Sequence, residues 1–125
     1  MEEQKILLVD DDAAVTFLNR YMLEKSQVTG RIYTAQNGRE ALELMEAQGL
    51  LPDVIFLDVN MPVMNGFEFL EALKAKPDCY NHTNVYMLTS SLREEDKEKA
   101  LAHSCVKKYF EKPITENMIE EVFGQ

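Results

Sequence analysis

The chain has 125 residues, 46% hydrophobic and 28% charged, with a formal net charge of −9, and this composition is typical of one globular domain with a sizeable core. The acidic balance excludes a nucleic-acid surface, which would be basic, and no apolar run approaches the about 20 residues that a membrane span needs. The N-terminus does not resemble a signal peptide, so we expect a cytoplasmic protein in which Cys79 and Cys105 remain reduced thiols.

Short runs of bulky apolar residues alternate with helical patterns five times along the chain. The runs fall at residues 6–9, 31–35, 54–57, 85–88 and 106–110. Their length and their Val, Ile, Leu, Phe and Tyr content are typical of buried strands.

The first three predicted helices have recognisable ends. The first starts near Ala13 and is capped by Asp11 or Asp12, the second ends at Gly49, and the third ends before Pro77. Apolar residues at helical spacing form the expected inner faces of the three helices: Val15, Leu18 and Met22; Ala41, Leu44 and Met45; Phe69, Leu70 and Leu73.

The C-terminal part of the chain has weaker helical patterns. Residues 78–84 are polar and predict a loop, and residues 91–94 form a capping-box pattern at the start of a fourth helix. Residues 95–99 are almost wholly charged, so we expect a thin inner face. Thr115 caps a short fifth helix, about ten residues long, with an apolar face at its end: Met118, Ile119, Val122 and Phe123.

Strands separated by helices imply right-handed crossovers. The expected fold class is therefore α/β, doubly wound, with a mostly parallel sheet covered by helices on both faces. Ligands bind such folds at the carboxyl edge of the sheet.

Polar residues follow four of the predicted strands at that edge. Asp10 and Asp11 follow the first strand, Asp58 the third, Thr89 the fourth and Lys112 the fifth. A carboxylate at the end of a buried strand is costly without partners, and clustered carboxylates with access to water suit Mg²⁺. A lysine beside them can neutralise a phosphoryl oxygen, and a threonine hydroxyl can donate to one. When the run of three aspartates is taken alone, helix capping is the better explanation of it.

Five segments carry a resemblance to the receiver domain of two-component response regulators, of the stand-alone chemotaxis-regulator kind. The resemblance extends over nearly the whole chain and rests on residues 9–12, 57–62, 65–66, 88–91 and 109–113. It implies a flavodoxin-like (βα)5 fold with strand order 2-1-3-4-5. It also implies that residues 1–125 form a single receiver domain with no output domain, a monomer or weak dimer.

The same resemblance assigns roles to the residues at the sheet edge. Asp58 resembles the residue that accepts a phosphoryl group from the phosphohistidine of a sensor histidine kinase or histidine phosphotransfer protein. Asp11, Asp58 and the backbone carbonyl of Asn60 would bind Mg²⁺ directly, and Asp10 would do so through water. Thr89 and Lys112 would hold phosphoryl oxygens.

Three further residues correspond to positions that modulate the family's signal. Tyr109 resembles the aromatic switch that turns inward when the hydroxyl of Thr89 moves toward the phosphate, although a surface aromatic explains it too. Asn60 and Ser91 occupy the two positions on which phosphoryl lifetime depends, and neither blocks an attacking water. Their small polar side chains predict moderate to fast loss of the phosphoryl group.

The sequence leaves three functions to compare. A phosphoacceptor switch would signal through the face formed by the fourth helix, the fifth strand and the fifth helix, and would catalyse only its own phosphorylation and dephosphorylation. A phosphorelay intermediate would pass the group to a histidine phosphotransfer protein. A Mg²⁺-dependent phosphohydrolase is the remote alternative, because Ala13-Ala14 stands where the haloacid dehalogenase motif has Gly-Thr.

Two histidines lie outside these motifs, and one peptide bond of interest lies within them. His82 and His103 are isolated in the sequence, and we interpret both as surface residues. The bond between Lys112 and Pro113 is a candidate for the cis form, and the sequence does not decide it.

Overall fold

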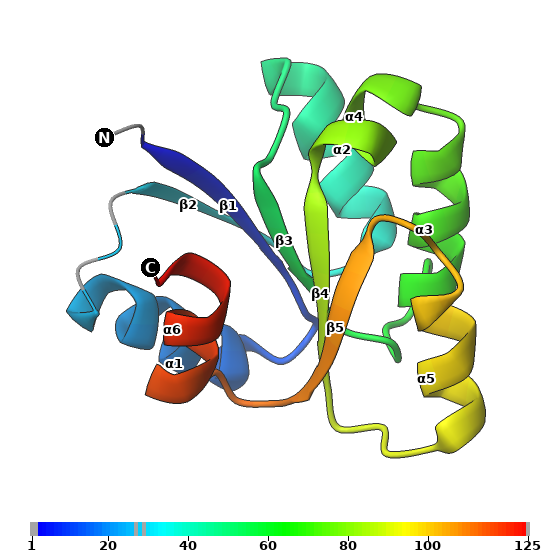
Figure 1. The fold of residues 1–125 in the computed structure, drawn as a ribbon. Helices are drawn as coiled ribbons and strands as arrows, with labels where there is room; N and C mark the ends of the chain where they lie inside the picture. Colours follow the sequence, from blue (N-terminus) through cyan, green and yellow to red (C-terminus); the bar gives the residue numbers. More distant parts are fainter. Residues whose placement is uncertain (1–2, 27, 29, 125) are drawn as a thin grey trace.

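The strands of the computed structural model form one parallel sheet. The model describes residues 3–26, 28 and 30–124. Within these residues, five strands lie in the order β2-β1-β3-β4-β5 (Figure 1), which confirms the expected fold class. Their bounds are β1 (Gln4–Val9), β2 (Gly30–Ala35), β3 (Val54–Leu57), β4 (Asn84–Thr89) and β5 (Val106–Glu111).

Helices cover both faces of the sheet (Figure 1). Two of them, α1 (Ala13–Lys25) and α6 (Glu116–Phe123), pack on one face with Leu23 and Ile119 in the core. The other face carries α2 (Gly38–Gln48), α3 (Gly66–Lys74), α4 (Pro77–His82) and α5 (Glu94–Leu101). None of the helices in the described part of the chain is long and apolar enough to cross a membrane.

The central strands explain why the core has two layers. Residues of a strand point alternately to opposite faces, so Leu7 and Val9 of β1 pack with α2 and α3, whereas Ile6 and Leu8 pack with α1 and α6. All four residues of β3 are buried. Burial on both faces is the physical reason that these strands are continuous apolar runs.

Several predicted helix ends are confirmed. Asp12 caps α1 by accepting from the backbone amides of residues 14 and 15. Gly49 ends α2 in the left-handed conformation, as predicted. A capping box of Asn65 and Glu68, which was not predicted, closes the start of α3. The peptide bond between Lys112 and Pro113 is cis.

The loop predicted at residues 78–84 is wrong. Pro77 begins the short helix α4, and Cys79 is the residue of this helix that is buried. The hydroxyl of Thr83 donates to the carbonyl of Pro52 over 2.6 Å, so contacts with a distant segment hold this turn of helix in place. The polar surface of these residues gave no indication of those contacts.

The inner face predicted for α1 is also partly wrong. Leu18 is exposed, whereas the polar Asn19 is buried together with Leu23. The side-chain oxygen of Asn19 accepts a 2.9 Å hydrogen bond from the backbone amide of Ile114, which precedes α6. Burial of the amide is therefore compensated by a long-range hydrogen bond.

The start of α5 differs from the predicted capping box. Arg93 is the N-cap residue, and no side-chain hydrogen bond caps this end within the described residues. Ser91 instead donates through its hydroxyl to Asp96 in the first turn of the helix, over 2.6 Å. The expected thin inner face is confirmed, because Ala100 is the one buried residue among residues 94–101.

Candidate functional site

Backbone hydrogen bonds align the strand ends that carry the predicted site. The amide of Asp58 donates to the carbonyl of Val9 over 3.0 Å, and the amide of Lys112 donates to the carbonyl of Thr89 over 3.0 Å. The carboxyl ends of parallel strands meet at one edge of the sheet. The predicted residues at the ends of β1, β3, β4 and β5 therefore lie at the same edge.

Lys112 joins two of the predicted carboxylates. Its Nζ lies 3.0 Å from Oδ2 of Asp10 and 3.0 Å from Oδ2 of Asp58. The Lys112 side chain is 13% exposed, and the two carboxylates are 5% and 4% exposed. One ammonium thus compensates part of the negative charge of two buried acids, which would otherwise repel each other.

Backbone amides bind the remaining oxygens of these carboxylates. Oδ1 of Asp58 accepts from the amide of Val59 over 2.8 Å, and Oδ1 of Asp10 accepts from the amide of Asp12 over 2.8 Å. Burial raises the pKa of Asp10 despite the stabilising hydrogen bonds from Asp12 and Lys112. Burial alone would lower the pKa of Lys112, but its bonds to the two carboxylates outweigh that effect and raise it. The lysine therefore stays protonated in the pocket.

The carboxylates can also hold a cation. Asp10, Asp11 and Asp58 each offer an oxygen within 4.8 Å of the others, and Asp11 is exposed whereas the other two are buried. Hard oxygen donors with one side open to water match the preference of Mg²⁺. The donor set of Asp10, Asp11 and Asp58 fits the predicted metal. Asn60 is exposed, just past Asp58 on the same connection.

Thr89 and Tyr109 meet at the backbone of Ser91. The hydroxyl oxygen of Thr89 accepts from the amide of Ser91 over 3.2 Å, which leaves the hydroxyl proton of Thr89 free to donate. The hydroxyl of Tyr109 donates to the carbonyl of Ser91 over 2.9 Å. Tyr109 is half-buried, and this burial raises its pKa. The hydroxyl of Tyr109 is therefore bound to the connection after β4, as a switch at this position would require, and its role as a switch stays a prediction.

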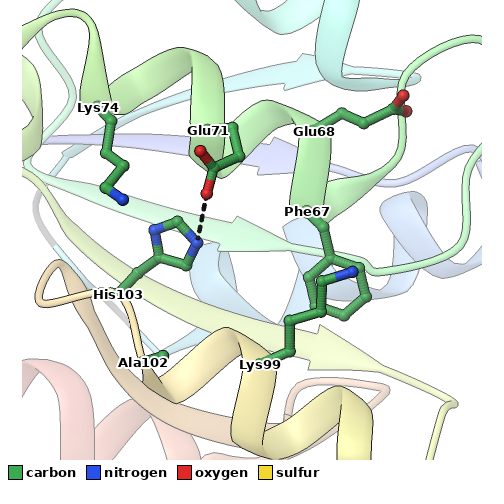
Figure 2. Close-up of a pocket in the computed structure, with 7 residues that line it drawn as sticks. All are labelled: Phe67, Glu68, Glu71, Lys74, Lys99, Ala102 and His103. Carbon is green, nitrogen blue, oxygen red and sulfur yellow. Dashed lines mark ion pairs between the residues drawn. The ribbon is translucent and has the colours of Figure 1, made fainter.

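The expectation for His103 is wrong as well, because this side chain is 8% exposed. Nδ1 of His103 lies 3.2 Å from the hydroxyl of Tyr80, and Nε2 lies 3.4 Å from Glu71 (Figure 2). Burial lowers the pKa of His103, and Glu71 opposes that effect. His82 lies at the surface as expected, 3.0 Å from Asp53.

Sequence reasoning missed Asp96. The carboxylate belongs to α5, yet it contacts Ser91 in the connection from β4, five residues earlier. A run of acidic residues at a helix start is ordinarily solvated, so the pattern at residues 94–96 carried no sign of this contact.

A separate hollow of about 400 Å³ lies between α3 and α5 (Figure 2). None of the predicted site residues lines it, and Nζ of Lys99 lies over the ring of Phe67 there, 4.4 Å from the centroid. This hollow is distinct from the acidic pocket at the sheet edge. Its lining residues are Phe67, Glu68, Glu71, Lys74, Lys99, Ala102 and His103.

Comparisons with known proteins agree with this architecture. A family model described as a response regulator receiver domain matches residues 6–123. The crystal structure of a two-component response regulator from Cytophaga hutchinsonii is similar with a TM-score of 0.89 and 31% identity, covering 98% of this chain and 96% of that one. The chemotaxis response regulator CheY4 of Vibrio cholerae has a TM-score of 0.79 and 33% identity, covering 97% and 96%.

One curated relative is much longer. A protein-glutamate methylesterase/protein-glutamine glutaminase of Geobacillus kaustophilus is 39% identical over 103 residues. The match covers 82% of this chain but 27% of that enzyme. The similarity therefore concerns only the receiver part of the enzyme.

Proposed function

The chain belongs to the response regulator receiver domain family, and we propose from this premise that Asp58 is its phosphoacceptor. The phosphoryl donor would be the phosphohistidine of a sensor histidine kinase or of a histidine phosphotransfer protein. The observation that carries the proposal is the position of Asp58, buried at the carboxyl end of β3 and bound to Lys112. Accepting a phosphoryl group is general for receiver domains.

The residues around Asp58 suit phosphoryl transfer. An Asp58 oxygen attacks the phosphorus, the bond from phosphorus to the donor imidazole breaks, and an acyl phosphate forms. Lys112, already 3.0 Å from Asp58, neutralises a phosphoryl oxygen, and the free proton of Thr89 donates to another. Mg²⁺, when bound by Asp11, Asp58 and the carbonyl of Asn60, with Asp10 acting through water, supplies further charge neutralisation.

The phosphoryl group would then be lost by attack of water. Asn60 is exposed and its amide can orient a water molecule, while Ser91 carries no bulk to obstruct one. Moderate to fast self-dephosphorylation follows from these two small polar side chains. The chain would thus catalyse only its own phosphorylation and dephosphorylation and reset quickly.

The output of the switch would be a change in protein contacts. The proposed face consists of α5, β5 and α6, where Tyr109 of β5 is bound through Ser91 to the connection that leads into α5. A shift of Thr89 toward the phosphoryl group would act on Ser91 through their hydrogen bond and so reach Tyr109. A downstream protein that binds this face would then distinguish the two states.

Labelling by acetyl phosphate tests the assignment of Asp58. Asp58→Ala and Asp58→Asn should both abolish Mg²⁺-dependent labelling. Mass spectrometry of the intact protein and its peptides measures the label and locates it. Asp78→Ala, which removes an exposed carboxylate of α4, is the matched control and should be labelled normally. Full labelling of the folded Asp58 variants at another carboxylate would overturn the proposal.

The metal assignment has its own test. Mg²⁺ removal by a chelator should stop labelling, and Asp11→Asn should weaken Mg²⁺ affinity more than Asp12→Asn, because Asp12 caps α1. A larger loss of affinity from Asp12→Asn would show that the neighbouring carboxylate is the ligand. Transfer of the label onward to a histidine phosphotransfer protein would favour a relay carrier over a terminal switch.

A further inference from the structure

Ser91 contacts three side chains that belong to different parts of the fold. Its amide donates to the hydroxyl oxygen of Thr89 over 3.2 Å, and its carbonyl accepts from the hydroxyl of Tyr109 over 2.9 Å. Its own hydroxyl donates to Oδ2 of Asp96 over 2.6 Å. One residue therefore contacts both Thr89 and Tyr109.

Among the three partners of Ser91, Asp96 belongs to α5. It lies in the first turn of that helix, where a carboxylate is favoured by the helix dipole. The N-cap residue Arg93 makes no capping side-chain hydrogen bond in the described part of the chain, and Ala100 is the buried residue of α5. The contact with Ser91 therefore links the start of α5 to the connection from β4.

From these contacts we propose that Asp96 is a positioning residue for phosphoryl binding. It holds Ser91 so that the backbone amide of Ser91 keeps Thr89 oriented, with its hydroxyl proton free to donate to the phosphoryl group. Asp96 touches neither the phosphoryl group nor the metal in this scheme. The inference rests on the proposed function of Asp58 and Thr89 and extends it to α5.

Prior orientation of the donor is the physical reason for an effect on affinity. A hydroxyl that is already oriented loses less freedom when it meets the phosphoryl oxygen than one that must be ordered at that moment. Coupling is reciprocal, so a phosphoryl group that binds Thr89 also favours the arrangement in which Ser91 contacts Asp96. Phosphorylation would thereby stabilise the first turn of α5.

A purely electrostatic role for Asp96 predicts that its loss changes the affinity for the phosphoryl group in the opposite direction. A negative charge near an anionic ligand weakens its binding, so loss of that charge would strengthen binding. Asp96→Ala also raises intrinsic helix propensity, so weaker binding cannot be attributed to a poorer helix former. The direction of the change therefore separates positioning from charge.

The test measures the affinity for beryllofluoride, a phosphoryl mimic, by calorimetry in the presence of Mg²⁺. Asp96→Ala should reduce this affinity about three- to tenfold, the range expected when one hydrogen bond of a coupled network is lost. Ser91→Ala should give a similar loss, and the double variant should add little to either. Asp96→Asn retains an acceptor and should restore most of the affinity.

Two controls define what each result means. Glu98→Ala removes an exposed carboxylate of the same helix and should leave the affinity for beryllofluoride unchanged. The Mg²⁺ affinity without beryllofluoride should be the same in the wild type and in the variants of Asp96, Ser91 and Glu98. Unchanged or tighter binding by Asp96→Ala, or additive losses in the double variant, overturns the inference. Absence of Mg²⁺-dependent binding in the wild type, or its persistence in Asp58→Asn, overturns the proposed function instead.

Amide exchange provides a measurement that does not depend on affinity. Beryllofluoride should slow exchange in the first turn of α5 in the wild type and in Asp96→Asn, but not in Asp96→Ala. Equal protection in all three proteins would contradict the link between Asp96 and the pocket. A circular dichroism spectrum and a thermal unfolding curve verify that each variant is folded.

Discussion

Helices α3 and α5 cover the same face of the sheet, yet they are held in different ways (Figure 1). Three apolar side chains of α3, those of Phe69, Leu70 and Leu73, are fully buried, and a capping box closes its start. In α5 six of eight residues are charged, and Ala100 is its buried residue. One helix is fixed by the core, whereas the other is fixed mainly by polar contacts at its ends.

The polar contacts of α5 reach two different regions. At its start, Asp96 binds Ser91 beside the proposed phosphoryl pocket. Toward its end, Lys99 lies over the ring of Phe67, and His103, just past the helix, contacts Glu71 (Figure 2). A helix with little buried apolar surface belongs to the low-stability part of a domain, so modest forces can move it. A signal from the pocket should therefore pass into α5 rather than into α3.

Core truncation should give the largest difference between the two helices. Phe69→Ala should lower the free energy of unfolding by about 3–5 kcal/mol because it leaves a cavity in the core. Ala100→Gly should cost about 1 kcal/mol, mainly through helix propensity. Urea unfolding followed by circular dichroism measures both. Similar losses from the two substitutions would show that α5 is as firmly packed as α3.

The second prediction concerns pH and the contact between the end of α5 and α3. Burial lowers the pKa of His103, aided by Lys74 and opposed by Glu71. The folded state therefore favours the neutral ring, and its contribution to stability is present above the unfolded pKa of about 6.5 and lost as the pH falls. The effect can reach at most about 1.4 kcal/mol per pH unit, the limit for one proton.

Measurement of this effect requires a variant without the titrating ring. Wild type and His103→Gln should be unfolded in urea at about pH 7.5 and about pH 5.5, which lie above and below the unfolded histidine pKa of about 6.5. The wild type should lose more stability on acidification than the variant. The same pH dependence in both proteins would mean that another group is responsible.

The helix starts provide a third, smaller contrast. Asn65→Ala should destabilise the protein by about 1 kcal/mol, because it removes the acceptor of the α3 capping box. Arg93→Ser supplies a capping side chain that α5 lacks and should stabilise the first turn by about 0.5 kcal/mol. Amide exchange of residues 94–97 measures the second change locally. Slower exchange should accompany Arg93→Ser, and faster exchange would contradict our account of this end.

The ring of Phe67 gives the smallest expected effect. Phe67→Leu keeps an apolar side chain but removes the aromatic face beneath Lys99, and it should cost about 0.5–1 kcal/mol. Lys99→Met removes the charge and is the partner for a double-mutant cycle. Fully additive losses would show that the stacked ammonium contributes nothing to holding α5 against α3.

The sheet, its apolar strands and the polar residues at the strand ends were all predictable from the amino-acid sequence. Buried strands differ from their surroundings within a few residues, so their position is encoded locally. Asp10, Asp58 and Lys112 were predicted to meet because parallel strands place their carboxyl ends at one edge, and the structure brings these three together. The local pattern of residues therefore specifies both the fold and the position of the pocket.

Which polar groups are buried, and what they bind, depends on long-range packing. The buried side chain of Asn19 accepts a hydrogen bond from the amide of Ile114, 95 positions away. The buried ring of His103 contacts the hydroxyl of Tyr80, 23 positions away. The contact of Ser91 with Asp96 spans five positions, but it depends on the path of the chain from β4 into α5. A polar side chain has the same local pattern whether its partner is water or a distant group. Only the packed chain supplies the partner that makes its burial favourable.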